Sequence, residues 1–372
     1  MKIKILFTFQ RLKKVIKFSI IGLIAMMLFQ ACSLKPLAWT PQQAPKLEGK
    51  TEENSLLSTT KYLSIGNWYG PEDIAVGKDG SIYCGVHISK NNFKDGRILK
   101  IDTAGEVSVF CNTEAWVTGL HFDSNDNLIA CDQKRGLISV DKKGSITVLA
   151  NKDEKGRRIL IPNDVDIAND GVIYFSNTSS KVLFSRKHAR KILMEVRPDG
   201  GLYSYNPETK NVKTLIDSSF FGNGVAVSQN NDFVLMADLS KYRIVRYWLK
   251  GSNKGETDVF IDNLPGLPNG ISRREDGSFW VGYTTRRDEL LDKIQSKKML
   301  KKFIYSIPLW LQPKQEPFGM IMNVSESGKI LKTYYDTTGK VVSEASSVEE
   351  HNGYLYLGGD LIDHINKYKL ED

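Results

Sequence analysis

Alternating apolar and polar positions, broken by short turns rich in Asp, Asn and Gly, recur along most of the chain. One pattern returns six times: a polar residue, alternating apolar residues, a turn, and a second apolar run. Alternation with a period of two that is broken by Asp-Gly or Asn-Gly predicts a β-hairpin. The six copies begin at Glu72, Thr118, Asn163, Asn223, Asn269 and Ser346.

The spacing of these copies predicts the architecture. Their starts are separated by 46, 45, 60, 46 and 77 residues, and further strand-like pairs such as 97–102 and 106–110 lie between them. Four strands in roughly 45 residues are typical of one blade of a β-propeller. We therefore predict an all-β fold, a six-bladed β-propeller over residues 60–370. A β-sandwich with chance spacing is the alternative.

Two intervals exceed the period, which predicts insertions at about 178–200 and about 284–317. In the second, apolar residues follow roughly helical spacing and lysines crowd the polar side, which predicts a helical lid-like insertion, as one amphipathic helix or a broken pair. Two interpretations stay open. The insertion is a lid packed on the propeller with a solvated lysine face, or its residues 284–312 face a membrane.

The N-terminus has the layout of an export signal. Six basic residues and no acidic ones precede an uncharged apolar run at 18–31, whose 14 residues reach about 21 Å as a helix, short of a hydrocarbon core of about 30 Å. Residues 1–31 are therefore predicted to direct export. The body would then lie in the cell envelope, facing the periplasm or the exterior.

The residues after this run resemble a bacterial lipoprotein cleavage box. Ala31 precedes Cys32, although Leu28 stands one place too early and Phe29 occupies the usual leucine position. We predict a lipid anchor at Cys32, followed by a tether over 32–59 that contains three prolines. An uncleaved single-pass signal anchor, or simply a buried cysteine, is the alternative.

Composition and charge narrow the function classes. Of 372 residues, 41% are hydrophobic and 25% are charged, which is typical of a globular chain. The net charge is +8, and removing the six basic residues of the N-terminal segment leaves +2. A nearly neutral body is a poor binder of phosphate backbones, so we expect no nucleic-acid partner. The four cysteines form no CxxC motif, which argues against a zinc site or a disulfide scaffold.

The starts of the repeats carry the candidate chemistry. The first strand of each blade lines the central channel, so these residues converge at one mouth. Glu72, Asn163, Asn223 and Asn269 offer one carboxylate and three amide oxygens. Calcium takes six to eight such hard oxygens, so we predict one Ca²⁺ in the central channel. An ordinary turn role for Asn-Gly at 223–224 and 269–270 is the alternative.

The segments 70–76, 162–167, 221–227, 242–251, 262–266 and 279–282 resemble the strictosidine synthase-like family. More distantly, the chain is similar to paraoxonases and to the regucalcin and gluconolactonase group. The resemblance covers nearly all of residues 60–370 and implies a six-bladed propeller. It also implies a channel metal whose ligands match Glu72, Asn163 and Asn223. The next ligand in those families is normally Asp, so Asn269 implies weaker calcium binding; Asp73 and Asp164 are expected to point away from the axis.

The catalytic residues of these families match poorly. The first histidine of the paraoxonase pair falls at about Thr118. The glutamate of the plant synthase falls at Ser346 and its companion histidine at Glu344. Strictosidine synthase activity is therefore not expected.

These observations favour a calcium-dependent hydrolase of the cell envelope, similar to an esterase or lactonase. The channel metal would polarise the carbonyl of a small ester or lactone, and His87 is the candidate general base. A loop or surface histidine is the plainer interpretation of His87. A non-catalytic propeller that binds a ligand or protein at the membrane is the alternative function, and lipid sensing through 284–312 is a third. GxSxG, HExxH, GxGxxG and P-loop motifs are absent.

Overall fold

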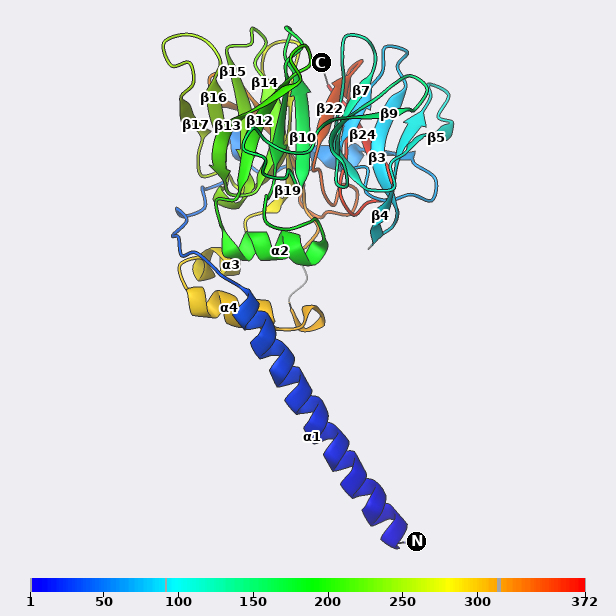
Figure 1. Cartoon of the computed structure of the whole chain (residues 1–372), viewed down its shortest axis with the longest axis vertical. Coiled ribbons are helices and arrows are strands. Elements are labelled where there is room, and N and C mark those ends of the chain that lie inside the picture. The colour runs from blue at the N-terminus through cyan, green and yellow to red at the C-terminus, as the bar shows by residue number, and fades with distance from the viewer. Residues whose placement is uncertain (1, 91, 313–315, 372) are drawn as a thin grey trace.

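A computed structural model describes residues 2–90, 92–312 and 316–371. Their strands form six antiparallel sheets of four strands each. The inner strands of successive sheets contact one another around a ring, so the sheets are the blades of a propeller (Figure 1). The predicted six-bladed β-propeller is confirmed.

Five blades follow the chain in simple order, from the inner strand at the channel to the outer strand. Their strands are β2 (Ile74–Val76), β3 (Ile82–Ser89), β4 (Asn92–Ile101) and β5 (Val107–Asn112); β6 (Val117–Phe122), β7 (Leu128–Asp132), β8 (Gly136–Val140) and β9 (Ile146–Ala150); β10 (Pro162–Ile167), β11 (Ile173–Asn177), β12 (Gly200–Asn206) and β13 (Asn211–Ser219); β14 (Gly222–Val227), β15 (Phe233–Asp238), β16 (Arg243–Trp248) and β17 (Thr257–Ile261); and β18 (Gly266–Arg273), β19 (Phe279–Arg286), β20 (Gly319–Val324) and β21 (Ile330–Asp336).

The sixth blade joins both ends of the propeller sequence. Strands β22 (Val348–His351), β23 (Tyr354–Leu357) and β24 (His364–Lys369) are completed by β1 (Lys61–Ser64) as the outer strand. β1 runs antiparallel to β24 and pairs with it from end to end. Because the first strand of the body closes the last blade, the ring is fastened by backbone hydrogen bonds and not only by side-chain packing.

Apolar side chains fill the spaces between neighbouring blades. Between the fourth and fifth blades, for example, Leu235, Ile244, Phe279 and Val281 are fully buried in one cluster. Removing each such side chain from water contributes roughly 1.5–3 kcal/mol. The alternation seen in the sequence therefore corresponds to the two faces of each blade.

The helices gather at one mouth of the channel. α2 (Arg186–Glu195) follows β11, while α3 (Glu289–Ile294), α4 (Lys298–Ser306) and the short helix η4 (Leu309–Leu311) follow β19. Both β11 and β19 are second strands of their blades, so they end at the mouth where the inner strands begin. Figure 1 shows these helices as a layer beneath the propeller, from which α1 (Lys2–Ser33) projects.

The remaining short helices are η1 (Gly49–Thr51), η2 (Leu56–Thr59) and η3 (Leu239–Lys241).

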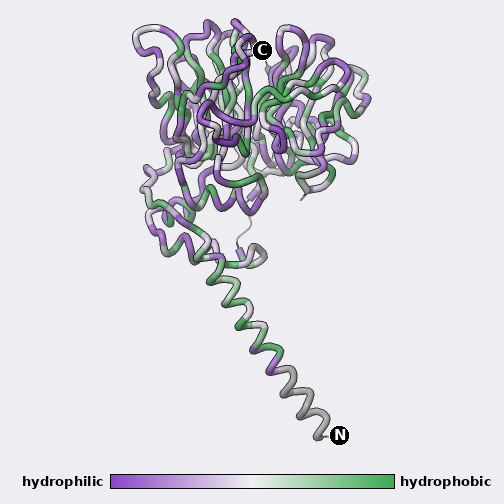
Figure 2. The backbone as a smooth tube through the Cα atoms, viewed as in Figure 1, coloured by the Kyte–Doolittle hydropathy of each residue, from purple (hydrophilic) through white to green (hydrophobic). Residues whose placement is uncertain are grey.

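Helix α1 is longer than the apolar run at 18–31 indicated. Its segment Lys13–Ser33 has 21 residues and is long and apolar enough to cross a membrane, since 21 residues of helix span about 31 Å. Figure 2 shows the apolar character along this helix. The uncharged run of the sequence begins only after Lys17, but lysine side chains near a helix end can reach the interface and extend the usable length.

The segment after α1 is bound to the helical layer and is not a free tether. We call residues 34–48 the strap. Leu37 N donates to Glu195 O at 2.8 Å, and Trp39 N donates to Gln295 O at 3.2 Å. The ammonium group of the fully buried Lys301 donates to Leu37 O at 2.9 Å. These bonds fix α1 relative to α2, α3 and α4.

Candidate metal centre

Four inner strands share an irregularity at the same place. The pairing register shifts between Val117 and Leu120, between Pro162 and Val165, between Gly222 and Val225, and between Pro268 and Ile271. Thr118, Asn163, Asn223 and Asn269 lie inside these four shifts. A bulge re-aims a side chain that regular alternation would place elsewhere. Four of the six repeat starts are therefore local departures from strand geometry.

Three of the four shifts also contain a glycine that the packing requires, at Gly119, Gly224 and Gly270. A Cβ atom at Gly224 would lie 2.1 Å from the carbonyl oxygen of Asn269, and one at Gly270 would lie 2.8 Å from that of Ser346. Inner strands of adjacent blades approach so closely there that only glycine fits. Asn-Gly at these places is therefore a product of ring packing, and the turn interpretation is wrong.

The four predicted metal ligands are buried, and each leaves an oxygen without a partner. Glu72, Asn163, Asn223 and Asn269 are 5%, 6%, 2% and 4% exposed. No described residue donates a hydrogen bond to Glu72 Oε2 or to the Oδ1 atoms of the three asparagines. A buried oxygen without a partner costs about 1–3 kcal/mol, so four at equivalent places need an explanation. A hard cation such as Ca²⁺ fits this donor set.

Neighbouring hydroxyl groups orient two of the asparagines. Asn163 Nδ2 donates to Thr178 Oγ1 at 3.1 Å, and Asn269 Nδ2 donates to Thr284 Oγ1 at 2.7 Å. In both cases the threonine lies 15 residues after the asparagine. Because the amide nitrogen is held on one side, the amide oxygen is held on the other. The repeated pattern does not single out these threonines, although their equal spacing from the asparagines is a usable signal.

Further carboxyl groups surround Glu72. Burial raises the pKa of Glu72 well above its ordinary value, and Asp360 and Glu344 are among the negative neighbours that add to the rise. Burial, with Asp360 beside it, raises the pKa of Glu344 to about 8, and burial raises that of Asp360 to about 6. Asp360 Oδ1 is a further buried oxygen without a partner. A bound cation would favour the charged forms of these carboxyls.

Amide oxygens are essential to any metal site here. Among the described residues, no three His, Cys, Asp or Glu side chains form a group able to hold a metal by themselves. Glu344 and Asp360 were missed as neighbours of the site because they lie outside the repeated inner-strand pattern. The Gly358-Gly359 pair before Asp360 was a signal of close backbone approach, since a Cβ at Gly358 would lie 2.6 Å from Glu72 O.

His87 is part of β3 and is fully buried, so the surface interpretation is wrong. Its ring packs against Phe93 and Trp116, with centroid distances of 4.6 and 5.5 Å. Nδ1 lies 2.7 Å from Ser89 O and Nε2 lies 3.3 Å from Asp360 O. Burial lowers the pKa of His87, so the neutral ring predominates at pH 7. The contact of Nε2 with Asp360 O places His87 beside Asp360, whose carboxyl group neighbours Glu72.

Asp73 and Asp164 do not simply point away from the axis, as expected from strand alternation. Asp73 Oδ2 accepts a hydrogen bond from Leu120 N at 2.7 Å, and Asp164 Oδ2 accepts one from Val225 N at 2.6 Å. Each carboxylate thus ties its inner strand to the next blade. Both also line a cavity of about 110 Å³ among the inner strands. The shift in register at 162–165 interrupts the alternation at Asp164, and the shift at 117–120 lies in the strand to which Asp73 is bound.

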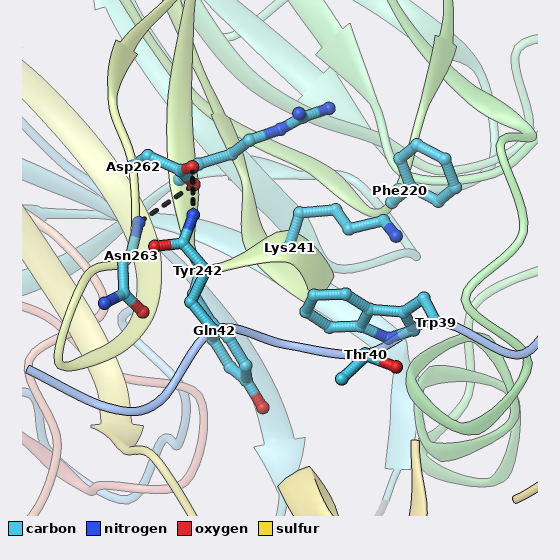
Figure 3. A pocket seen from close by; sticks show the side chains of 9 residues that line it. Trp39, Thr40, Gln42, Phe220, Lys241, Tyr242, Asp262 and Asn263 are labelled. Atoms are coloured by element: carbon cyan, nitrogen blue, oxygen red, sulfur yellow. Dashed lines mark hydrogen bonds between the residues drawn. The ribbon is translucent and has the colours of Figure 1, made fainter. Parts of the chain in front are cut away.

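A larger pocket lies away from the channel, between the strap and the fourth blade. It has a volume of about 380 Å³, and none of the four predicted metal ligands lines it. The ammonium of Lys241 lies 4.0 Å from the ring of Trp39 and 4.4 Å from that of Phe220, while Gln42 Nε2 donates to Asp262 Oδ2 at 2.9 Å (Figure 3). These contacts hold the strap on the propeller.

Solved structures with this architecture include lactonases and a calcium-binding protein. A gluconolactonase from Xanthomonas campestris superposes with a TM-score of 0.60 at 16% identity, over 91% of this chain and 98% of its own. Regucalcin from Agrobacterium tumefaciens, a calcium-binding protein, superposes with a TM-score of 0.56 at 14% identity, over 84% and 94%. At these identities the likeness shows the fold alone.

Sequence comparison gives the family. Residues 163–252 match the family described as strictosidine synthase, and residues 49–101 match the strictosidine synthase-like N-terminal family. The adipocyte plasma membrane-associated protein of Rattus norvegicus is 31% identical over 359 residues, covering 90% of this chain and 92% of the relative. Protein strictosidine synthase-like 3 of Arabidopsis thaliana is 28% identical over 354 residues, covering 87% and 88%. The predicted resemblance is confirmed: the chain belongs to the strictosidine synthase-like family of six-bladed propellers.

Proposed function

We propose that this protein is a calcium-dependent hydrolase of the cell envelope that acts on a small ester or lactone. The observation that carries the proposal is the set of four buried oxygens without partners, on Glu72, Asn163, Asn223 and Asn269. These residues would hold one Ca²⁺ at the channel mouth. When bound, the ion supplies a Lewis acid for the carbonyl oxygen of the substrate.

Two residues are candidates to accept the proton of the attacking water. His87 is the residue that the sequence predicts, but both its ring nitrogens face backbone carbonyls. Asp360 neighbours Glu72, and its Oδ1 is buried without a partner. We favour Asp360, because its free oxygen needs no rearrangement of the aromatic side chains around His87. Strictosidine synthase activity is not proposed, since Ser346 stands where the plant enzyme has its glutamate.

Structures that share this fold guide the choice of substrates for the proposed hydrolysis. Among propellers of this fold, one is a gluconolactonase and another is a calcium-binding regucalcin. Both have low sequence identity to this chain, so their activities are guides to the choice of substrates. A panel of lactones and carboxylic esters is the appropriate starting set.

The experiment is hydrolysis of this panel by the purified full chain, with calcium and after chelation. Glu72→Gln and Asn163→Ala remove one metal ligand each, and Asn211→Ala on an exposed part of β13 is the matched control. We expect hydrolysis to need calcium and to be lost in the two ligand variants only. Hydrolysis that survives chelation and both variants would show that the mechanism is wrong.

A non-catalytic propeller that binds a ligand or protein is the second candidate. It is favoured by the burial of His87, which leaves the predicted base without an exposed nitrogen. Calcium binding without turnover of any ester or lactone in the panel would support it. The two candidates share the metal site and differ only in whether Asp360 or His87 receives a proton.

We also propose that the N-terminus anchors the protein to a membrane of the cell envelope. Cys32 lies in the last turn of α1 and is exposed, as lipid attachment requires. If the helix is retained, Lys13–Ser33 would be a single-pass anchor instead. Mass spectrometry of the mature N-terminus distinguishes the two, because a lipoprotein would begin at a diacylated Cys32.

A further inference from the structure

The layer of helices at the channel mouth has an apolar surface that the fold leaves exposed. We call it the lower face; it comprises Met299, Leu300 and Phe303 of α4 together with Trp310 and Leu311 of η4. Met299, Phe303 and Trp310 are 76%, 57% and 78% exposed. Single exposed apolar side chains are ordinary, but a group of five on adjacent helices indicates an interaction surface.

The opposite side of α4 packs against the rest of the protein. Lys301 and Tyr305 are buried, and the guanidinium of Arg190 in α2 donates to the carbonyl oxygens of Ile304 and Tyr305 at 3.1 and 3.2 Å. These bonds fix how α4 is rotated about its axis. The lower face therefore points away from the propeller and cannot be buried by a small rotation of the helix.

Helix α1 determines where a bilayer would lie relative to α4. α1 contacts α4, and Figure 1 shows that it leaves the helical layer at the level of α4 and η4. Leu34, directly after α1, is fully buried in one cluster with Ile294 and Tyr305. There is thus no flexible linker between α1 and the layer. Wherever the apolar segment Lys13–Ser33 enters a bilayer, α4 lies at the surface of that bilayer.

The charges beside the lower face suit an anionic surface. Lys297, Lys298 and Lys302 flank Met299 and Phe303 in the sequence of α4. Within the described residues, no carboxylate forms an ion pair with these three lysines, whereas Lys293 in α3 pairs with Glu289 at 2.5 Å. Apolar side chains bordered by unpaired lysines are typical of helices that lie in the interface of membranes with anionic lipids.

We propose that the lower face inserts into the interfacial region of the anionic bilayer that α1 enters, with α4 along the membrane surface. The partner is a phospholipid bilayer and not a protein. The bilayer would cover the exposed apolar side chains, and the lysines would contact its negative headgroups. The contact does not depend on whether the protein hydrolyses an ester. If α1 is replaced by a lipid on Cys32, that lipid would hold the helical layer at the same bilayer, because Cys32 lies where α1 meets the layer.

The test measures how deeply single positions enter the bilayer. Met299→Cys and Phe303→Cys are labelled with an environment-sensitive dye in the full chain, reconstituted into vesicles of phosphatidylcholine and phosphatidylglycerol. Quenching by brominated lipids reports insertion. Ser124→Cys, exposed on a hairpin at the other end of the propeller, is the matched control, and the labelled unsubstituted chain corrects for dye on Cys32. We expect at least threefold stronger quenching at 299 and 303 than at 124.

A charge series tests the role of the lysines. Replacing Lys297, Lys298 and Lys302 with Glu should reduce quenching at 299 at least twofold in anionic vesicles, and little in pure phosphatidylcholine. The same exchange at the exposed Lys142, Lys143 and Lys213 is the control. Quenching at 299 as weak as at 124 overturns the proposal. The proposal is also overturned if the emission shift of the dye depends on the density of protein in the vesicles and not on their lipid composition. That result would mean that a second copy of the chain covers the lower face.

Discussion

Asn163 and Thr178 are joined by a hydrogen bond of 3.1 Å from the amide nitrogen to the hydroxyl oxygen. Thr178 in turn donates to Gly222 O at 2.9 Å, so it connects the third blade to the fourth. Asn163 Oδ1 is left buried and without a partner. An amide held in this way presents its oxygen to a cation at no further cost in side-chain entropy.

The first prediction concerns the hydrogen bond from Asn163 Nδ2 to Thr178 Oγ1, which we call the brace. Thr178→Val keeps the shape and removes the acceptor, so Asn163 loses its fixed orientation. Residues that orient ligands typically contribute 10- to 100-fold to metal affinity, and we expect calcium affinity to fall about tenfold. Isothermal titration calorimetry measures it. Thr257→Val, on an exposed edge strand, is the control and should leave the affinity unchanged; equal effects of the two variants would contradict the role of the brace.

A second prediction concerns Asn269, the candidate ligand that stands where the related families normally have Asp. Asn269 Oδ1 is buried without a partner, and the side chain nitrogen is bound by Thr284. Asn269→Asp adds a negative charge where the cation would lie, and Thr284 can donate to the new carboxylate. We expect tighter calcium binding, by about tenfold, corresponding to about 1.4 kcal/mol. In calcium-free buffer the same variant should be less stable, because a further buried carboxylate is added beside Glu72. Thermal denaturation with and without calcium measures both effects, and a variant that binds calcium more weakly would argue against this site.

The third prediction separates the two candidate bases. Asp360→Asn should lower hydrolysis by roughly 10²- to 10⁴-fold, the usual contribution of a general base. His87→Gln should chiefly destabilise the fold, because His87 fills a fully buried position between Phe93 and Trp116. Activity is compared per folded molecule, with circular dichroism as the measure of folding. Full loss in folded His87→Gln with activity retained in Asp360→Asn would assign the proton transfer to His87 instead.

A fourth prediction follows from the buried lysine that holds the strap. Burial lowers the pKa of Lys301 to about 8, whereas an unfolded lysine keeps a pKa of about 10.4. Between these values the unfolded chain binds more protons than the folded one. The free energy of unfolding should therefore rise with pH from about 8 to about 10, by up to about 1.4 kcal/mol per pH unit.

Lys301→Met should remove this rise, while the exposed Lys298→Met should keep it. Urea denaturation at several pH values is the measurement. An unchanged slope in Lys301→Met would mean that this lysine remains charged in the folded protein over the whole range.

The buried, unpartnered oxygens of the candidate metal centre could be located from the sequence because their residues stand at the same position of a repeated pattern. Four inner strands share the same shift in register, and Asn163, Asn223 and Asn269 lie in equivalent surroundings inside three of these shifts. Glu344 and Asp360 follow no such rule. They lie at loops of the sixth blade and come near Glu72 only because the ring closes.

Ring closure itself had no signal in the sequence of β1. Lys61–Ser64 reads as a short polar strand, and its partner β24 lies about 300 residues away along the chain. The strap lies within the tether predicted over 32–59, because its prolines and polar residues resemble a linker. Its order depends on single contacts, such as the bond from Lys301 to Leu37 O, which only the folded helical layer can provide.

Crystallography of the protein grown with calcium, with the ion located by its anomalous scattering, tests the metal site most directly. We predict one ion at the channel mouth, bound by Glu72 and by the Oδ1 atoms of Asn163, Asn223 and Asn269 at about 2.3–2.6 Å. Crystals grown at millimolar calcium could instead show only water at the channel mouth, hydrogen-bonded to these four oxygens. That result would contradict both the metal site and the calcium-dependent hydrolase.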